Sequence, residues 1–159
     1  MNDQQDLPPK MRPSARNMAP KPLPRPQDPV EQEFWKRCQD GHLYFQQCGS
    51  CGLFRHLPRY ICAKCGSPEY SWECSSGKGS LYSWTITHQA LHPAFAHEIP
   101  FVAAVVELEE GVRMATRLIN WNRETLALDL PVELTFETIG DGFRLPVFRP
   151  RERQTCHES

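Results

Sequence analysis

No apolar run in this sequence approaches the ~20 residues that a membrane-spanning helix needs, and the first residues lack the apolar core of a secretion signal. A strong charge of either sign is also missing, because 18 Lys and Arg balance 19 Asp and Glu to a net charge of −1 over 159 residues. This balance excludes a protein that coats nucleic acid or an anionic membrane by charge alone. We therefore expect a cytoplasmic protein, in which thiols stay reduced.

The common catalytic motifs are missing as well. The sequence contains no Gly-x-Ser-x-Gly, no phosphate-binding glycine loop and no dinucleotide fingerprint. His88 and His92 are four residues apart, but on an extended segment that spacing covers roughly 13 Å, too far for one metal ion. His97 and Glu98 could form an acid–base pair, although a lone loop histidine is more often solvated. An enzyme that uses His92 or His97 is therefore the least favoured hypothesis.

Proline is concentrated at the N-terminus. Eight of the fifteen prolines lie in the first 29 residues, which contain no aromatic residue, no Val and no Ile. Such a segment cannot bury enough apolar surface to offset the entropy lost on ordering. We expect residues 1–27 to form a disordered or polyproline-like tail, with recognition by a proline-binding domain as an alternative. Residues 151–159 form a second, polar tail.

A helix is predicted for residues 28–41. Asp28 is a suitable N-cap, it is followed by proline at the first helical position, and Glu31 lies three residues after it. Phe34 and Trp35 then need a surface to pack on. Either they pack on their own domain, or they anchor a partner protein.

From residue 42 onward the sequence predicts β structure. Three short aromatic-rich segments lie between the cysteines, at residues 43–45, 59–61 and 70–72. Five longer β-prone segments follow, at residues 81–87, 101–108, 112–119, 132–136 and 143–148. Five strands separated by turn signals suggest a small closed barrel or sandwich. Residues 120–130 are predicted to form a short helical insertion.

Two cysteine pairs carry the strongest motif. Cys48 and Cys51 form one Cys-x-x-Cys pair, and Cys62 and Cys65 form a second after ten intervening residues. Two such turns on neighbouring hairpins supply the four tetrahedral thiolates of a structural zinc site. Four thiolates leave no coordination position for water, so the metal is not catalytic. Iron in a rubredoxin-like site fits the same sulfurs and is the weaker alternative.

Three further cysteines have no assigned chemistry. Cys38 in the helix and Cys74 after a strand are interpreted as small buried residues. Cys156 lies in the polar C-terminal tail and is interpreted as a free thiol. No base partner for a catalytic cysteine is evident in the sequence.

The order of these features resembles a family of acyl-CoA-associated proteins with an N-terminal rubredoxin-like zinc ribbon and a C-terminal OB-fold. The resemblance covers residues 28–150 and rests on the helix, both cysteine pairs and four later motifs. The later motifs are Gly77-Lys78-Gly79-Ser80-Leu81-Tyr82-Ser83-Trp84-Thr85, His92-Pro93-Ala94-Phe95, Pro100-Phe101-Val102-Ala103-Ala104-Val105-Val106-Glu107-Leu108 and Leu145-Pro146-Val147-Phe148-Arg149-Pro150. It implies a mostly β fold with a zinc ribbon at residues 42–76 and a five-stranded OB-fold barrel at residues 77–150.

The resemblance also implies a function. It implies a non-catalytic accessory subunit of a hetero-oligomer with a thiolase-superfamily enzyme: a thiolase, an acyltransferase or a thiolase-like aldolase. Such a subunit helps to bind an acyl-CoA or acyl-thioester for C–C bond formation or cleavage, and family members also occur with acyl-CoA hydratase-type domains. Expected partner contacts are Phe34, Trp35, His92 and Phe95. The arginines that could bind CoA phosphates, or be merely solvated or paired, are Arg55, Arg59, Arg117 and Arg144.

A single-stranded nucleic-acid-binding module is the alternative, because ribbons and OB-folds also occur together in such proteins. Residues 79–150 carry five Arg and no Lys against nine Asp and Glu, a net charge of 5 − 9 = −4. Residues 42–78 carry four basic and two acidic residues, a net charge of +2. An acidic barrel repels a phosphate backbone, so a protein partner is favoured over nucleic acid.

Overall fold

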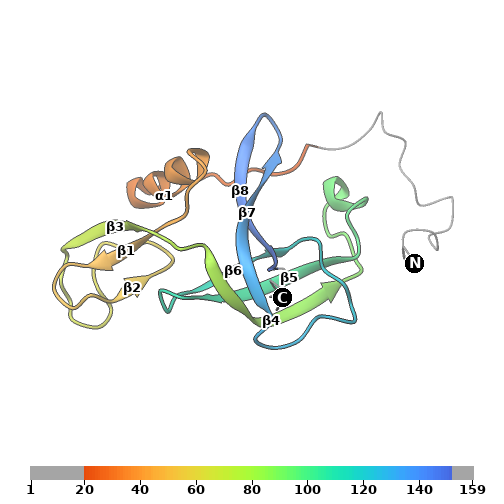
Figure 1. Cartoon of the computed structure of the whole chain (residues 1–159). Coiled ribbons are helices and arrows are strands. Elements are labelled where there is room, and N and C mark those ends of the chain that lie inside the picture. The colour runs from red at the N-terminus through yellow and green to blue at the C-terminus, as the bar shows by residue number, and fades with distance from the viewer. Residues whose placement is uncertain (1–19, 152–159) are drawn as a thin grey trace, which may run out of the picture.

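A computed structural model describes residues 20–151 of the chain (Figure 1). Residues 1–19 of the tail predicted for residues 1–27 lie outside the described residues, as does the C-terminal tail from residue 152 onward with Cys156. Within the described part, one helix precedes a small three-stranded sheet and a closed barrel of five strands. No helix in this part of the chain is long and apolar enough to cross a membrane.

Helix α1 (Pro29–Gln39) confirms the predicted N-cap. The Asp28 carboxylate accepts a hydrogen bond from the backbone N–H of Val30 at 2.8 Å, and Pro29 occupies the first helical position. Val30, Phe34 and Cys38 form the buried face. The helix therefore packs its apolar stripe against the rest of the chain.

The ribbon is a three-stranded antiparallel sheet in the order β2-β1-β3, formed by β1 (Tyr44–Cys48), β2 (Phe54–Arg55) and β3 (Tyr70–Cys74). The first and third predicted segments overlap strands, but the prediction of a strand at residues 59–61 was wrong. The Arg59 backbone N–H donates to the side chain of the buried Gln46 at 2.7 Å, so this N–H is not available to pair with a neighbouring strand. The second strand instead forms at Phe54–Arg55, directly after the first cysteine pair.

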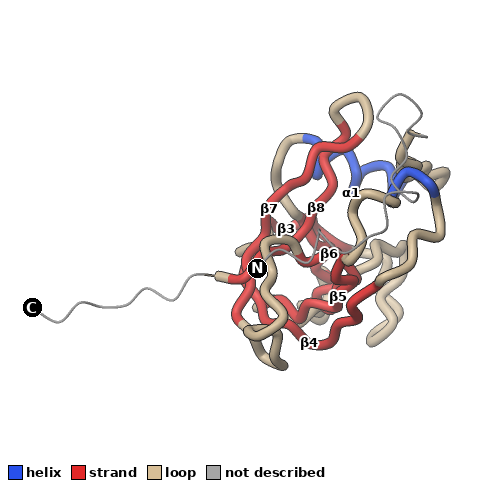
Figure 2. The backbone as a smooth tube through the Cα atoms, turned by 90° about the vertical axis from the view of Figure 1, so that its right-hand side faces the viewer, coloured by secondary structure: helices blue, strands red, loops and turns tan. Residues whose placement is uncertain are grey.

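The barrel closes in the order β4-β5-β6-β8-β7, which is the topology of an OB-fold (Figure 2). Its strands are β4 (Lys78–Thr87), β5 (Phe101–Leu108), β6 (Arg113–Leu118), β7 (Pro131–Ile139) and β8 (Phe143–Pro150). β4 pairs with β5 from Gly79 to Thr87, with a bulge at Tyr82, and its first residues, Lys78 to Ser80, also pair with β7 on the other side and close the barrel. Leu118 and Phe148 meet where β6 and β8 run parallel, and both are fully buried.

The predicted helical insertion at residues 120–130 was wrong, because this segment consists of turns. Asn120 and Asp129 have φ angles of 53° and 60°, which a right-handed helix does not allow. Leu81 also exchanges backbone hydrogen bonds with Asp129 and Leu130, at 3.0 and 2.9 Å. The segment therefore satisfies its backbone groups on β4 rather than on itself.

Residues 20–27 were assigned to the tail, but they run in an extended path along the barrel on the way to α1 (Figure 1). Lys21 forms an ion pair with Glu98, in the loop between β4 and β5, and lies 3.7 Å from a carboxylate oxygen of Glu137 on β7. Leu23 packs beside Gly140 in the turn between β7 and β8. Charge and apolar contacts therefore hold this segment against two barrel loops.

Candidate functional site

The two cysteine pairs meet at one point of the ribbon. The sulfur atoms of Cys48, Cys51, Cys62 and Cys65 all lie within 4.8 Å of one another. The Cys48–Cys65 and Cys51–Cys62 sulfur distances are both 3.6 Å. A tetrahedral zinc ion with Zn–S bonds of ~2.3 Å requires sulfur atoms about 3.8 Å apart. The predicted donor set is thus arranged as a tetrahedral metal requires.

Two similar backbone turns hold these sulfurs in place. The Gly52 N–H donates to the Cys48 carbonyl, and the Gly66 N–H donates to the Cys62 carbonyl, both at 2.9 Å. Gly52 and Gly66 have φ angles of 68° and 74°, and no atom lies within 4 Å of an added Cβ at either position. Glycine is therefore needed for its backbone conformation rather than for lack of space.

The turns also favour thiolate at the first cysteine of each pair. Backbone hydrogen bonds from Cys65 and Lys64 lower the pKa of Cys62 to about 6. Hydrogen bonds from Cys51 and Ser50 likewise lower the pKa of Cys48. Thiolates are the form that binds zinc or iron. The four residues fit a closed, structural site for a thiophilic metal, in which all donors come from the protein.

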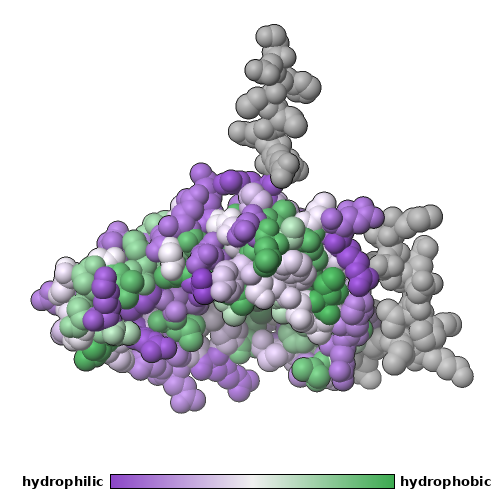
Figure 3. All heavy atoms as spheres, turned by 90° about the horizontal axis from the view of Figure 1, so that it is seen from below, coloured by the Kyte–Doolittle hydropathy of each residue, from purple (hydrophilic) through white to green (hydrophobic). Residues whose placement is uncertain are grey.

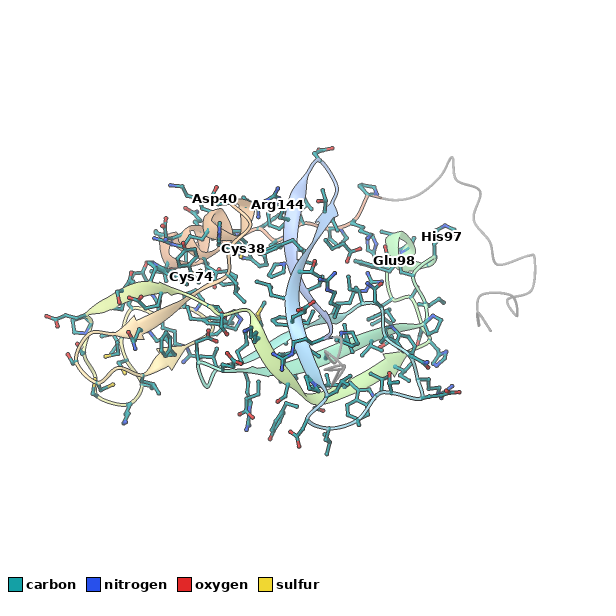
Figure 4. All side chains as sticks on the ribbon, in the orientation of Figure 1. Cys38, Asp40, Cys74, His97, Glu98 and Arg144 are labelled. Carbon is teal, nitrogen blue, oxygen red and sulfur yellow. The ribbon has the colours of Figure 1, made fainter. Side chains whose placement is uncertain are left out.

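The other cysteines in the described part lie outside this cluster. Cys38 is fully buried in α1, and burial raises its pKa to about 12, so it remains an inert thiol. Cys74 is exposed at the end of β3 and donates to the Ser75 carbonyl at 3.7 Å. The prediction that Cys74 is buried was therefore wrong: Cys74 shares a strand face with the half-buried Tyr70 and Trp72, but it lies at the exposed end of β3. Figure 4 shows both residues near the meeting point of α1 and the ribbon.

The two aromatic residues of α1 have different surroundings. Phe34 is only 3% exposed and its ring centroid lies 5.3 Å from that of His56. The Phe34 ring packs in the chain's own core, which favours the first of the two predicted alternatives, and a partner contact at Phe34 stays a prediction. Trp35 is half-buried, and its ring centroid lies 5.5 Å from that of Phe143 on β8. A contact between Trp35 and a partner protein stays a prediction.

The loop between β4 and β5 holds the other predicted contacts. His92 caps the short 3-10 helix η4 (Pro93–Phe95), where its Nδ1 accepts from the Ala94 N–H at 3.1 Å. Phe95 is half-buried, with its ring 6.1 Å from His92 and 5.8 Å from the Lys21 ammonium. Both side chains support the loop, and their contact with a partner stays a prediction.

Glu98 lies in an ion-pair cluster rather than beside His97. Its carboxylate binds Lys21 and Arg117, and Arg117 also lies 3.5 Å from Glu137. Burial alone would raise the pKa of Glu98, but the Lys21 hydrogen bond and the Arg117 charge hold it below its ordinary value. Glu98 is therefore a stable carboxylate, whereas His97 is exposed (Figure 4). This arrangement does not provide the acid–base pair considered from the sequence.

The four arginines proposed for CoA phosphates do not form one site. Arg117 belongs to the Glu98 cluster, and Arg144 lies at the end of α1 (Figure 4), where its backbone N–H donates to Gln39 at 2.8 Å. Arg55 and Arg59, in contrast, line the same cleft. The structure thus brings together two of the four.

This ribbon–barrel cleft has a volume of about 550 Å³ and lies between the segment around β2 and the β5–β6 turn. Its lining includes three arginines and one carboxylate, which are Arg55, Arg59, Arg113 and Glu107. It also includes three exposed aliphatic residues, Leu53, Leu57 and Ile61. Sequence reasoning missed the aliphatic group. The sequence feature that could have indicated these residues is the cluster of large apolar residues between the two cysteine pairs, where the ribbon has little core in which to bury them.

His56 also borders the cleft, with its ring packed 5.3 Å from Phe34 and 5.6 Å from Phe45. Its Nδ1 has no hydrogen-bond partner among residues 20–151. Burial lowers the pKa of His56 from 6.5 to about 4, so the ring is neutral at pH 7. Protonation would place an unpaired charge between two aromatic rings.

Acid is therefore expected to destabilise the protein through His56. The unfolded chain binds this proton near pH 6.5 and the folded chain only near pH 4, so the stabilising contribution is complete above pH 6.5 and falls as the pH drops to 4. The total loss is roughly 3 kcal/mol. Urea unfolding of the wild type and His56→Gln at pH 7 and pH 4.5 measures it. Release of metal in acid would lower the free energy of unfolding of both chains. The prediction is therefore contradicted if this free energy falls equally with pH in the wild type and in His56→Gln.

The helix, the four-cysteine ribbon and the closed barrel define a zinc-ribbon OB-fold protein. Residues 35–71 match the family described as "ChsH2, rubredoxin-like zinc ribbon domain", and residues 72–137 match "ChsH2, C-terminal OB-fold domain". The chain belongs to the ChsH2/DUF35 family. The family resemblance recognised in the sequence is thereby confirmed.

The similar proteins carry two kinds of name, aldolase-complex or scaffold proteins and hydratase alpha subunits. A chain of the solved structure "Ltp2-ChsH2(DUF35) aldolase" is 34% identical with a TM-score of 0.72, and the match covers 79% of this chain and 98% of that one. A "DUF35 domain-containing scaffold protein" of Methanocaldococcus jannaschii is 31% identical, over 66% of this chain and 75% of the relative. A "Probable enoyl-CoA hydratase alpha subunit" of Thermomonospora curvata is 37% identical over 82% of this chain. The chain spans only 41% of that hydratase subunit's length.

Proposed function

We propose that this chain is a non-catalytic, zinc-binding scaffold subunit that assembles with a thiolase-superfamily enzyme and helps to present an acyl-CoA or acyl-thioester for C–C bond formation or cleavage. The observation that carries this proposal is the 34% identity to a chain of the Ltp2-ChsH2(DUF35) aldolase, almost all of which is matched. The name of the archaeal relative, a scaffold protein, supports the same function.

The chemistry of the described residues supports a subunit that leaves catalysis to its partner. Among residues 20–151, the group of His, Cys, Asp or Glu side chains that could share a metal is the four-cysteine cluster, and its donors leave no position for substrate. Glu98 is held by Lys21 and Arg117. We therefore assign the reacting groups to the thiolase-like partner.

An acyl-CoA hydratase assembly is the second candidate partner. The observation that favours it is the match to the Thermomonospora curvata hydratase alpha subunit, together with 33% identity to a "3-oxo-4,17-pregnadiene-20-carboxyl-CoA hydratase alpha subunit" of Mycobacterium tuberculosis. The chain spans 41% and 32% of these relatives. Those longer proteins contain a further region beyond the part that matches this chain. In this system a separate hydratase chain would supply that region.

Nucleic-acid binding is disfavoured by the barrel's own contacts. OB-folds bind extended polymers on the face of their second and third strands, between the loop after the first strand and the loop between the last two. Here residues 20–27 contact both of those loops, through Glu98 and Gly140. The acidic charge of residues 79–150 adds repulsion for phosphates.

Co-expression with the thiolase-like protein encoded nearest to this chain's gene tests the proposal. We expect a stable complex on size exclusion, aldol or acyl-transfer activity in the complex, and none in this chain alone. A chain that binds no thiolase-like protein but forms a complex with a hydratase subunit would favour the second candidate. Binding of single-stranded DNA or RNA at physiological salt would support the nucleic-acid alternative instead.

A further inference from the structure

The ribbon–barrel cleft combines exposed aliphatic side chains with a basic group that has no acidic partner. Leu53, Leu57 and Ile61 are 40%, 58% and 56% exposed, although each borders the cleft. Seen from below, hydrophobic residues at the ribbon end of the molecule lie next to hydrophilic ones (Figure 3). Contiguous exposed apolar side chains with a polar rim are typical of protein-binding surfaces.

The three arginines of the cleft differ in what they can bind. Arg113 is paired with Glu107 at 3.1 Å, so its charge is already compensated. Arg55 donates through Nε to Gln46 at 2.8 Å and lies 5.3 Å from the Tyr70 ring centroid, and both of its terminal nitrogens are buried without a hydrogen-bond partner among residues 20–151. Arg59 is exposed, and none of the ion pairs in the described part of the chain includes it. One accessible guanidinium therefore remains.

We propose that the ribbon–barrel cleft is a docking site for a segment of the partner protein that places a carboxylate on Arg59 and aliphatic side chains on Leu53, Leu57 and Ile61. The proposal rests on the proposed function, because the occupant is a segment of the partner enzyme. Charge complementarity favours an acidic segment, since the cleft carries three arginines against one glutamate and His56 is neutral. Burying Leu57 and Ile61 supplies the apolar part of the binding energy.

A polyphosphate such as that of CoA fits the same cleft less well. A diphosphate with an additional phosphate needs several accessible cationic donors, whereas Arg59 is the one arginine of the cleft that is exposed and forms no ion pair within residues 20–151. The aliphatic residues would also be left uncovered. A peptide carboxylate flanked by apolar residues uses both features.

Two variants with matched controls test the docking site in the complex. Arg59→Glu and Leu57→Asp alter the cleft, whereas Arg123→Glu and Leu128→Asp make the same changes on exposed residues that do not border it. We expect each cleft variant to weaken the affinity for the thiolase-like partner at least tenfold and each control to leave it within about twofold. Metal content and melting temperature should match the wild type for all four chains.

A charge reversal identifies the acidic residue of the partner. Changing single Asp or Glu residues of the partner to Lys should restore binding to Arg59→Glu at one position and weaken binding to the wild type. Wild-type affinity in both cleft variants would overturn the docking site and leave the proposed function standing. Failure of the wild type to bind any thiolase-like protein would overturn both.

Two other occupants give distinct results that would also overturn the proposal. Direct binding of CoA to this chain alone, lost in Arg59→Glu, would assign the cleft to phosphates. A wild-type dimer in light scattering that becomes monomeric in Leu57→Asp would assign it to a second copy of the chain.

Discussion

Replacing Cys62 by serine is expected to remove the bound metal and unfold the ribbon. Structural zinc sites of this kind contribute ~10–16 kcal/mol of binding free energy at neutral pH, which is folding free energy for the segment that surrounds them. The ribbon contains strands of only two to five residues, so it has little other support. Elemental analysis should fall from about one zinc per chain to none, and limited proteolysis should cut between Cys48 and Tyr70.

Cys74→Ser is the matched control for this experiment, because it makes the same chemical change at an exposed cysteine outside the cluster. It should keep its metal and its melting temperature. A Cys62→Ser chain with unchanged metal content and proteolytic resistance would contradict the assignment. Iron in place of zinc in the wild type would support the rubredoxin-like alternative and leave the donor set unchanged.

Truncating Phe34 to alanine is expected to cost about 3–5 kcal/mol, the range for a fully buried phenylalanine. Its ring is 3% exposed and lies 5.2 Å from Trp35 and 5.3 Å from His56, so its loss leaves a cavity where α1 meets the ribbon. The free energy of unfolding from urea titration measures the effect. The midpoint should shift while the slope of the transition stays the same.

Trp35→Ala is the comparison for Phe34→Ala, because Trp35 is adjacent and only half-buried. We expect it to cost less stability than Phe34→Ala. Unchanged stability together with lost binding of the thiolase-like partner in Phe34→Ala would contradict the predicted structural role of Phe34 and support the partner anchor.

The metal site could be predicted from sequence because its information is local. A Cys-x-x-Cys pair followed by glycine specifies a turn with both sulfurs on one side, and Gly52 and Gly66 have the positive φ angles that such turns need. The N-cap at Asp28 is local in the same way. The five barrel strands were also predicted, because segments rich in β-branched and aromatic residues are separated by turn signals.

The errors arose where long-range contacts override local preference. Residues 120–130 have helix-forming composition, but backbone hydrogen bonds from Leu81 hold them in turns. Residues 59–61 are β-prone, yet the buried Gln46 takes the Arg59 N–H. Residues 20–27 likewise contain no local signal that Lys21 meets Glu98, 77 residues further along the chain.

The donor set, the helix start and the mostly β class could all be read from the sequence, since each depends on residues within a few positions of one another. The accessibility of side chains, in contrast, follows from the tertiary structure. It buried Phe34, paired Arg117 with Glu98, exposed Cys74, and placed Arg59 beside Leu57 and Ile61 in one cleft. Accessibility depends on how the ribbon, α1 and the barrel pack together, and that packing is a sum of contacts between residues far apart in the chain.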